Sequence, residues 1–339
     1  MGVPGPPPTD ELSADAPLVA VRRGPLVESY HRGRIVFCGP DGEFLDAVGA
    51  PDGYAYVRSS AKPFQALPLI LSGAADACGL TDEDLAVACA SHNAEERHLG
   101  AVRSILRKAG LSESDLQSGA HPPMYAPAAA ALARRGEEPR GIHGNCSGKH
   151  AGMLAVCAHQ GWETETYRKP DHPLQRWISD LVSKVCAVEQ DALVVSGDGC
   201  GLPAFAMPLR SLATGFARLA TGRCLPDDLA QAALRIRDAM RAHPFMVAGT
   251  GRLDTEVMEA TDLVTKMGAE GVLGVGSLDG WGMALKVSDG AGRAVRPAAL
   301  AALSRRGVEA SVSASAPVND LHGVQVGEIT SLWTSQPAE

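Results

Sequence analysis

Three short segments of this chain carry the residue types that serine chemistry requires. In chain order they are Ser59-Ser60-Ala61-Lys62, Ser91-His92-Asn93 and Lys266-Met267-Gly268. They have the pattern S-x-x-K, S-x-N and K-x-G, which is the layout of serine enzymes that cleave amide bonds with lysine as the proton carrier. A single S-x-x-K is common by chance, but all three segments in this order favour a functional interpretation.

Ser59 and Lys62 are spaced so that their side chains can meet. A serine hydroxyl becomes a useful nucleophile when a base within hydrogen-bond reach takes its proton. Lysine serves as that base when burial or a second cation lowers its pKa. Residues i and i+3 of a helical turn lie about 5–6 Å apart at Cβ. Pro63 disfavours a regular helical turn at Lys62, however, and either Ser59 or Ser60 is also suited to cap the following helix.

Two cysteines lie in glycine-rich loops beside polar residues. Cys146 is followed by Lys149 and His150, and Cys200 lies in the segment 196–201 after a β-like run at 192–195. Two thiolates with one nitrogen ligand suit zinc, and chemistry alone favours His150 or His143 as that ligand. Because no C-x-x-C pair is present, two buried free thiols or a disulfide remain as alternatives.

Five segments together resemble the bacterial L-asparaginases typified by the inducible Rhizobium enzyme. They span residues 58–65, 90–93, 143–150, 197–201 and 265–268. The resemblance covers nearly the whole chain, and Cys-Ser-Gly-Lys-His and Gly-Asp-Gly-Cys are its most specific parts. It implies an α+β fold, an αβα sandwich similar to that of serine β-lactamases and glutaminases, and a homodimer.

The resemblance also implies a role for each motif residue. Its expected catalytic pairs are Ser59 with Lys62 and Ser91 with Lys266, and its expected zinc ligands are Cys146, Lys149 and Cys200. Asp198 is expected beside a zinc-bound water and is counted with the substrate-binding residues. Lysine binds a metal only when it is deprotonated, so Lys149 is an unexpected ligand on chemical grounds. In the family, zinc supports substrate binding and does not deliver the nucleophile.

The resemblance implies an L-asparaginase that hydrolyses L-asparagine to L-aspartate and ammonia, and the motif residues are consistent with a two-step reaction. Ser59 attacks the carboxamide while Lys62 accepts its proton, and ammonia leaves after protonation through Ser91 and Lys266. Water then hydrolyses the acyl-enzyme by the reverse route. Which Ser-Lys pair acts first is left open.

Two polar residues beside the motifs are expected to bind substrate. The planar guanidinium of Arg58 matches a carboxylate through two hydrogen bonds and is expected to bind the substrate α-carboxylate. The alternative for Arg58 is a structural ion pair. Asn93 is expected to position the substrate amide, and its alternative is a helix cap.

Two other functions remain as alternatives. The first is another serine amidohydrolase, a glutaminase or a β-lactamase-like enzyme, and the second is a zinc-thiol sensor without catalysis. Asparagine and glutamine differ by one methylene, which a pocket distinguishes by only about 1–3 kcal/mol. The sequence therefore leaves glutaminase activity open.

Composition excludes several other classes. The net charge of −8 over 339 residues disfavours a nucleic-acid-binding surface. No run of apolar residues approaches the ~20 needed to span a bilayer, so no membrane partner is expected. The eight cysteines are scattered, which suits reduced thiols in the cytoplasm better than a disulfide framework.

Strands are expected at both ends of the chain, with helices between them. The strands are predicted at 18–24, 26–38, 43–48, 271–277, 281–288 and 323–333. The helices are predicted at 63–72, 82–89, 94–110, 126–135, 148–160, 172–186, 209–220, 226–242 and 297–306. This pattern predicts one domain over 17–335, with an antiparallel sheet from about 17–57 and 262–333, a helical part at about 63–242 and a disordered tail at 1–16.

Overall fold

The computed structural model describes residues 14–333. Most of the expected tail, residues 1–13, therefore lies outside the described part of the chain. Asp15 is already buried and forms an ion pair with Arg34, and the first strand begins at Ala16. The described structure thus starts slightly before the expected domain boundary.

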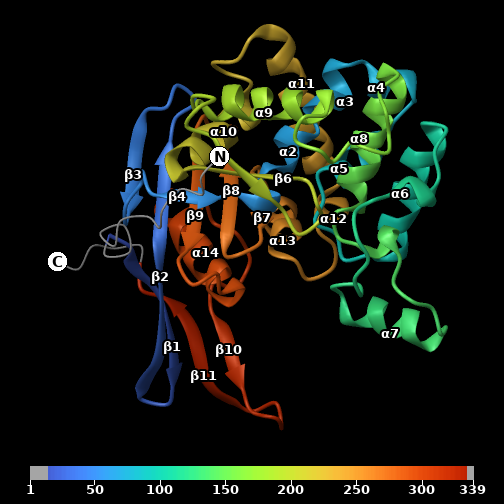
Figure 1. Ribbon diagram of the computed structural model, residues 1–339. Helices are drawn as coiled ribbons and strands as arrows, with labels where there is room; N and C mark the ends of the chain where they lie inside the picture. Colours follow the sequence, from blue (N-terminus) through green and yellow to red (C-terminus); the bar gives the residue numbers. More distant parts are fainter. Residues whose placement is uncertain (1–13, 334–339) are drawn as a thin grey trace.

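One antiparallel sheet joins the two ends of the chain (Figure 1). Its strand order is β10-β11-β1-β2-β9-β8-β7, and β3 pairs with β2. The strands are β1 (Ala16–Arg23), β2 (Leu26–Cys38), β3 (Phe44–Val48), β7 (Val264–Gly268), β8 (Val272–Gly276), β9 (Gly282–Val287), β10 (Ala316–Asn319) and β11 (Gln325–Ser331). N-terminal β1 lies antiparallel to C-terminal β11, and β2 lies antiparallel to β9. The expectation that terminal strands share one sheet is confirmed.

Helices cover both faces of this sheet. Successive side chains of a strand point to opposite faces, so Val36 and Cys38 of β2 join one apolar core while Ile35 and Phe37 join another. The first core contains α10 (Leu209–Thr221), and the second contains α14 (Val295–Arg305). The αβα sandwich expected from the sequence is confirmed.

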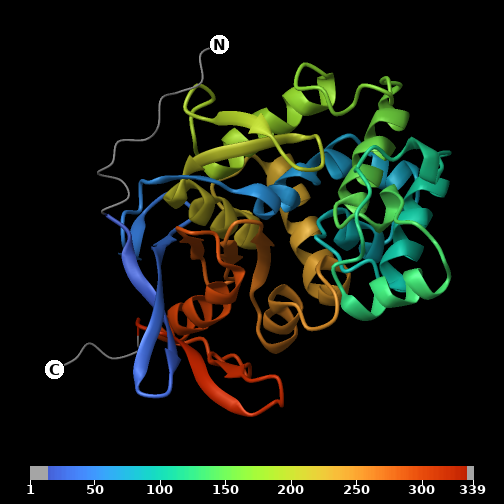
Figure 2. The ribbon, with the colours of Figure 1, turned by 60° about the horizontal axis from the view of Figure 1, so that its bottom comes forward.

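The remaining helices lie mostly to one side of the sheet, as Figure 2 shows. They are α2 (Lys62–Gln65), α3 (Leu67–Leu71), α4 (Ala74–Ala77), α5 (Asp82–Ala88), α6 (Glu96–Lys108), α7 (Ala126–Arg134), α8 (Ser147–Gln160), α9 (Pro173–Cys186), α11 (Asp227–Ala242), α12 (Pro244–Val247) and α13 (Leu253–Ala260). Short 3-10 helices are η1 (Arg58–Ala61), η2 (Glu113–Asp115), η3 (Gly141–His143) and η4 (Gly292–Ala294). A capping box formed by Thr81 and Asp84 starts α5.

A second, three-stranded sheet was not anticipated from the sequence. Its order is β4-β6-β5, with β4 (Tyr54–Tyr56), β5 (Val194–Gly197) and β6 (Pro203–Pro208). These strands are short and separated in the chain, so their periodicity is weak. The sheet is nevertheless important for the site, because it fixes the loop that carries Cys200 beside the turn that carries Ser59.

Candidate active site

Ser59 and Lys62 occupy one continuous turn at the junction of η1 and α2. Lys62 keeps a helical backbone, with φ −57° and ψ −38°, although Pro63 follows it. Proline is tolerated here because Pro63 lies in the first turn of α2, where its missing N–H is not needed. The Lys62 backbone N–H donates to the Ser59 carbonyl oxygen. The expected irregular turn is therefore a 3-10 turn that leads into a helix.

The direct serine–lysine hydrogen bond joins Lys62 to Ser91. Lys62 is completely buried, and its Nζ donates to Ser91 Oγ at 3.0 Å and also to the Ala90 carbonyl oxygen. The Ser59 hydroxyl is partly exposed and makes no hydrogen bond within residues 14–333. Lys62 thus contacts the serine that was expected to act with Lys266, and the catalytic pairing of Ser59 with Lys62 stays a prediction. Burial lowers the pKa of the Lys62 ammonium below its ordinary value.

Ser60, next to Ser59, has a structural role. Its side chain is completely buried, and Oγ donates to the Lys266 carbonyl oxygen at 2.8 Å. The N-cap of α2 is Ala61 and has no side-chain capping hydrogen bond, so neither serine caps the helix that follows. Ser60 instead fixes η1 against strand β7, which carries Lys266.

The Lys266 side chain is held by Asp254, which none of the sequence motifs contains. Nζ lies 3.3 Å from Asp254 Oδ2 and donates to the Met267 carbonyl oxygen at 2.8 Å. The other oxygen of Asp254 accepts the Met267 N–H at 2.8 Å. Burial lowers the pKa of Lys266 to about 8, the Asp254 charge opposes this shift, and the Lys62 charge adds to it. No local motif predicts the role of Asp254, because it lies on helix α13, which is separate from the motif that contains Lys266.

The segment that carries Ser91 lies between two loops of the site. Ser91 N–H donates to the carbonyl oxygen of Val247, and His92 N–H donates to that of Asn145. The buried His92 ring also lies 2.8 Å, Nε2 to Oγ, from Ser147. These contacts place Ser91 between the Cys146 loop and the 243–252 loop.

Asn93 is committed to contacts within the protein. Its amide nitrogen donates to the Thr250 carbonyl oxygen at 3.0 Å and to Glu95 Oε1 at 3.3 Å. Its amide oxygen accepts a hydrogen bond from Arg252 at 3.1 Å. The N-cap of α6 is Glu95, so the helix-cap alternative for Asn93 is wrong.

Arg58 forms the ion pair that was its structural alternative. Its Nε and Nη2 lie 2.9 Å and 2.8 Å from Asp198 Oδ1. Burial raises the pKa of Asp198, but the charges of Lys149 and Arg58 outweigh burial and hold that pKa below its usual value. Arg58 also has φ +48°, a strained conformation for a non-glycine residue, directly before Ser59. The ion pair therefore helps to hold the strained turn.

The two loop cysteines meet beside Lys149. Lys149 Nζ lies 3.4 Å from Cys200 Sγ, and a hydrogen bond between Cys146 and Cys200 holds the pKa of Cys146 well below its ordinary value. The same contact, together with burial, raises the pKa of Cys200. All eight cysteines are free thiols, so the disulfide alternative is wrong.

These donors fit zinc when Lys149 supplies the nitrogen. Within residues 14–333 no three His, Cys, Asp or Glu side chains form a metal-binding group, so two thiols and a lysine make up the set. The histidines that chemistry alone favoured face other partners: His150 Nδ1 contacts the Tyr167 hydroxyl at 2.6 Å, and His143 Nδ1 accepts the Arg140 N–H. Sulfur and nitrogen donors at one buried point are the ligands that zinc prefers.

Close packing accounts for the spacing of the Cys-Ser-Gly-Lys segment. A Cβ added to Gly148 would lie 2.0 Å from the Val87 carbonyl oxygen, so only glycine lets the start of α8 rest on α5. Ser147 donates to the Ile142 carbonyl oxygen and contacts His92. These two residues seat the first turn of α8 so that Cys146 and Lys149 face the site.

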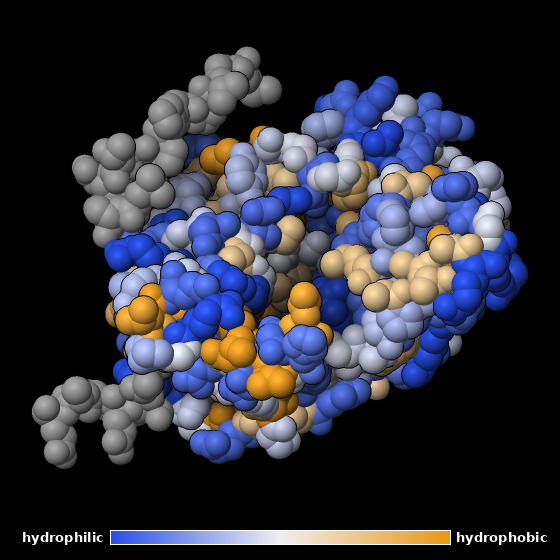
Figure 3. All heavy atoms as spheres, turned by 90° about the horizontal axis from the view of Figure 1, so that it is seen from below, coloured by the Kyte–Doolittle hydropathy of each residue, from blue (hydrophilic) through white to orange (hydrophobic). Residues whose placement is uncertain are grey.

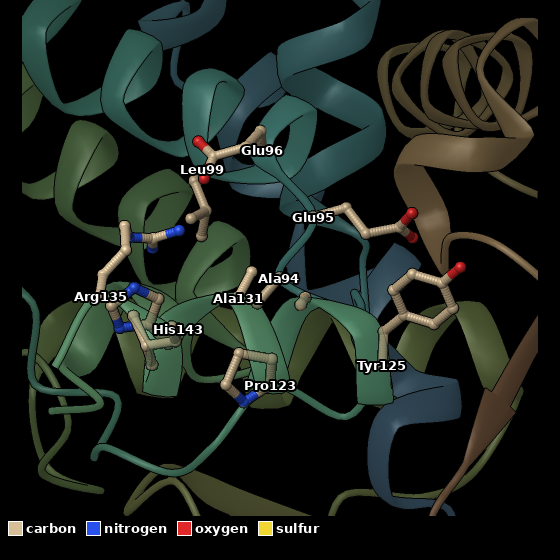
Figure 4. A pocket seen from close by; sticks show the side chains of 11 residues that line it. Ala94, Glu95, Glu96, Leu99, Pro123, Tyr125, Ala131, Arg135 and His143 are labelled. Carbon is tan, nitrogen blue, oxygen red and sulfur yellow. The ribbon is translucent and has the colours of Figure 1, made fainter. Parts of the chain in front are cut away.

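A hollow opens between the strand half and the helical half of the molecule when it is viewed from below (Figure 3). A separate cavity of about 180 Å³ lies between the start of α6 and α7, with Glu95 and Tyr125 at one end and Arg135 and His143 at the other (Figure 4). None of the expected catalytic serines and lysines lines this cavity. It is therefore distinct from the cluster around Lys62.

The family model described as L-asparaginase II matches residues 19–331, which is nearly the whole chain. The chain belongs to the L-asparaginase II family. The match includes every residue of the serine, lysine and cysteine cluster. This member of the family is therefore an amidohydrolase that acts on a small-molecule amide. Within residues 14–333, no helix is both long and apolar enough to cross a membrane.

Comparison with individual proteins adds little about the substrate. No curated protein matches this chain. The crystal structure of Mglu in its native form is 15% identical, with a TM-score of 0.40 over 90% of this chain and 68% of that chain. A probable glutaminase from Bacillus subtilis, complexed with 6-diazo-5-oxo-L-norleucine, is 13% identical, with a TM-score of 0.36 over 75% of this chain and 76% of that chain. At these values, neither similarity bears on the function.

Proposed function

We propose that this amidohydrolase is an L-asparaginase, which converts L-asparagine and water to L-aspartate and ammonia. The observation that carries the proposal is the buried contact of Lys62 Nζ with Ser91 Oγ at 3.0 Å. Lys62 lies on the same turn as Ser59, whose hydroxyl is free. Lys266 approaches this group from strand β7, which Ser60 ties to the turn. Two buried lysines beside two serines provide both a proton acceptor and a proton donor.

The chemistry proceeds by two acyl transfers. In the first, Ser59 Oγ forms a bond to the side-chain carbonyl carbon while Lys62 takes the hydroxyl proton. The C–N bond then breaks, and ammonia leaves with a proton delivered through Ser91 and Lys266. In the second, a water molecule attacks the ester and loses a proton, Ser59 regains its proton, and L-aspartate is released. Lys62 contacts Ser91 directly, which supports a proton path between the two serines.

We propose that Cys146, Lys149 and Cys200 hold a zinc ion beside this machinery. When bound, zinc would supply a Lewis-acidic positive charge that helps to bind an oxygen of the substrate. The charges of Lys149 and Arg58 both lower the pKa of Asp198, so its carboxylate balances the positive charge at this end of the site. The proton transfers are assigned to the serines and lysines alone.

The proposed activity is tested by measuring ammonia release from L-asparagine and L-glutamine and ring opening of a β-lactam, with and without added zinc. We expect L-asparagine to be the best substrate. A higher kcat/KM on L-glutamine would make the protein a glutaminase. Hydrolysis of the β-lactam alone, or release of ammonia from no substrate, would refute the proposal.

The zinc site is tested by replacing one thiol ligand at a time. Cys146→Ser and Cys200→Ser should raise KM for L-asparagine by more than they lower kcat, because the metal supports binding. Metal analysis of protein purified without a chelator should find zinc in the wild type and less in both variants. Cys224→Ser, at an exposed cysteine, is the matched control and should change neither value. Wild-type protein without zinc would count against the site.

The pH dependence of kcat/KM reports on Lys266. If protonated Lys266 donates to the leaving ammonia, activity should fall above its pKa of about 8. Asp254 favours the charged ammonium, so Asp254→Asn should lower this pKa and move the alkaline decline to lower pH. Glu256→Gln, on the same helix but paired with Arg296, is the control and should leave the profile in place. A decline that stays put or moves upward in Asp254→Asn would contradict this role.

The homodimer and the cytoplasmic location implied by the sequence remain predictions. Sedimentation of the purified protein tests the first, and fractionation of the producing cell tests the second.

A further inference from the structure

Arg252 is a partly exposed arginine without an acidic partner at the edge of the site. Its Nη1 donates to Asn93 Oδ1 at 3.1 Å and lies 4.0 Å from Met124 Sδ. Within residues 14–333, no Asp or Glu side chain forms an ion pair with it. Two of the five guanidinium N–H groups suffice for these contacts, so donors remain for a ligand.

Other arginines in this part of the fold are paired. Arg241 contacts Asp262, Arg296 contacts Glu256 and Arg97 contacts Glu83. The lack of a partner at Arg252 is therefore a local feature and does not reflect a shortage of carboxylates nearby.

Glu95, which contacts the same loop, forms hydrogen bonds with groups other than Arg252. Glu95 accepts the Thr250 backbone N–H at 2.9 Å and the Thr250 hydroxyl at 2.7 Å. It also accepts a hydrogen bond from Asn93. Glu95 thus anchors the 243–252 loop and does not neutralise Arg252.

This anchoring holds Arg252 on a rigid support. Gly249 has φ +111°, and a Cβ there would lie 2.5 Å from Glu95 Oε1, so the loop closes tightly against the segment after Ser91. Asn93 bridges the two segments through Thr250 and Arg252. A fixed guanidinium loses little entropy when it binds a ligand.

Arg252 lies close to the reactive groups. Burial and the charge of Lys62 lower the pKa of Lys266, and the charge of Arg252 lowers it further. Its hydrogen-bond partner Asn93 is two residues from Ser91. Arg252 directly precedes α13 and Met124 lies shortly before α7, so the guanidinium spans the space between the starts of these two helices.

We infer that Arg252 binds the α-carboxylate of the amino acid substrate. The role assigned to Arg58 from the sequence falls to Arg252, because Asp198 already occupies the Arg58 guanidinium. A fork of two N–H donors matches a carboxylate in geometry and charge. The inference rests on the proposed function, since it assumes that the substrate is an amino acid amide.

The test compares L-asparagine with β-alaninamide, which has the same carboxamide and amino group but lacks the α-carboxylate. Arg252→Gln removes the charge and keeps a donor for Asn93. It should lower kcat/KM on L-asparagine by about 100-fold, mainly through KM, and change that on β-alaninamide by less than about threefold. Arg252→Lys keeps the charge without the fork and should fall between the wild type and Arg252→Gln. Arg235→Ala, which removes an arginine paired with exposed Asp76, is the control and should leave both substrates unaffected.

Binding of the product provides a readout that does not depend on turnover. Calorimetry should show about 100-fold weaker binding of L-aspartate to Arg252→Gln, with binding of β-alanine unchanged. Equal losses with and without the α-carboxylate would overturn the inference, because Arg252 would then act only through the loop. An unchanged L-aspartate affinity would overturn it as well. If the wild type released no ammonia from L-asparagine or L-glutamine, the proposed function would fail first, and this inference with it.

Discussion

Ser59→Ala is expected to lower kcat for L-asparagine by ~10⁴-fold or more, because the nucleophile would be lost. The Ser59 hydroxyl is partly exposed and makes no hydrogen bond within residues 14–333, so its removal should leave the fold intact. Steady-state ammonia release measures the activity, and thermal unfolding measures the stability. A variant that kept near wild-type turnover would show that Ser59 is not the nucleophile.

Ser60→Ala is the matched control, since it removes a neighbouring hydroxyl with a different role. Ser60 Oγ is buried and bonded to the Lys266 carbonyl oxygen, so its loss should cost about 1 kcal/mol in the free energy of unfolding while activity persists. Ser91→Ala completes the set. If it alone were inactive, the nucleophile would be the serine that contacts Lys62 directly.

Lys62→Met is expected to lower kcat by ~10³-fold or more, because the general base would be lost. The reason is geometric: Lys62 Nζ contacts Ser91 Oγ at 3.0 Å on the turn that carries Ser59. Methionine fills a similar volume and removes a buried charge but leaves the Ala90 carbonyl oxygen without its donor, so the free energy of unfolding should change by less than about 2 kcal/mol. Single-turnover and steady-state rates measure the first effect, and denaturant unfolding measures the second.

The control for this substitution is Lys169→Met, at an exposed lysine, which should leave kcat unchanged. A tenfold or smaller loss in Lys62→Met would show that another group accepts the proton. If Lys62→Met does not fold, Lys62→Arg is tested in its place. Arginine keeps a buried cation but is a poor base, so this variant should be equally inactive.

Local patterns predicted most of the longer elements, but not all of those that carry the site residues. The strand at 26–38 and the start of the helix at residue 82 depend on neighbours within a few residues, and both were predicted correctly. Strands β4, β6, β7 and β10 and helices α4, α12 and α13 were missed because they are short, so their periodicity cannot be distinguished from that of loops. Helix α13 carries Asp254 at its start, so missing it also meant missing the partner of Lys266.

The sequence alone determined which residue types take part, because spacing within a turn or loop is a local property. Motif spacing grouped Ser59, Lys62, Ser91 and Lys266, whereas only the family resemblance implied that Lys149 joins Cys146 and Cys200. Only the tertiary structure decided which of these side chains contact each other. Lys62 meets Ser91 across 29 residues, and Arg58 meets Asp198 across 140. Such contacts depend on how strands and helices pack. The sequence contains several residues of suitable chemistry for each side chain, and only the packing selects the one that lies within reach.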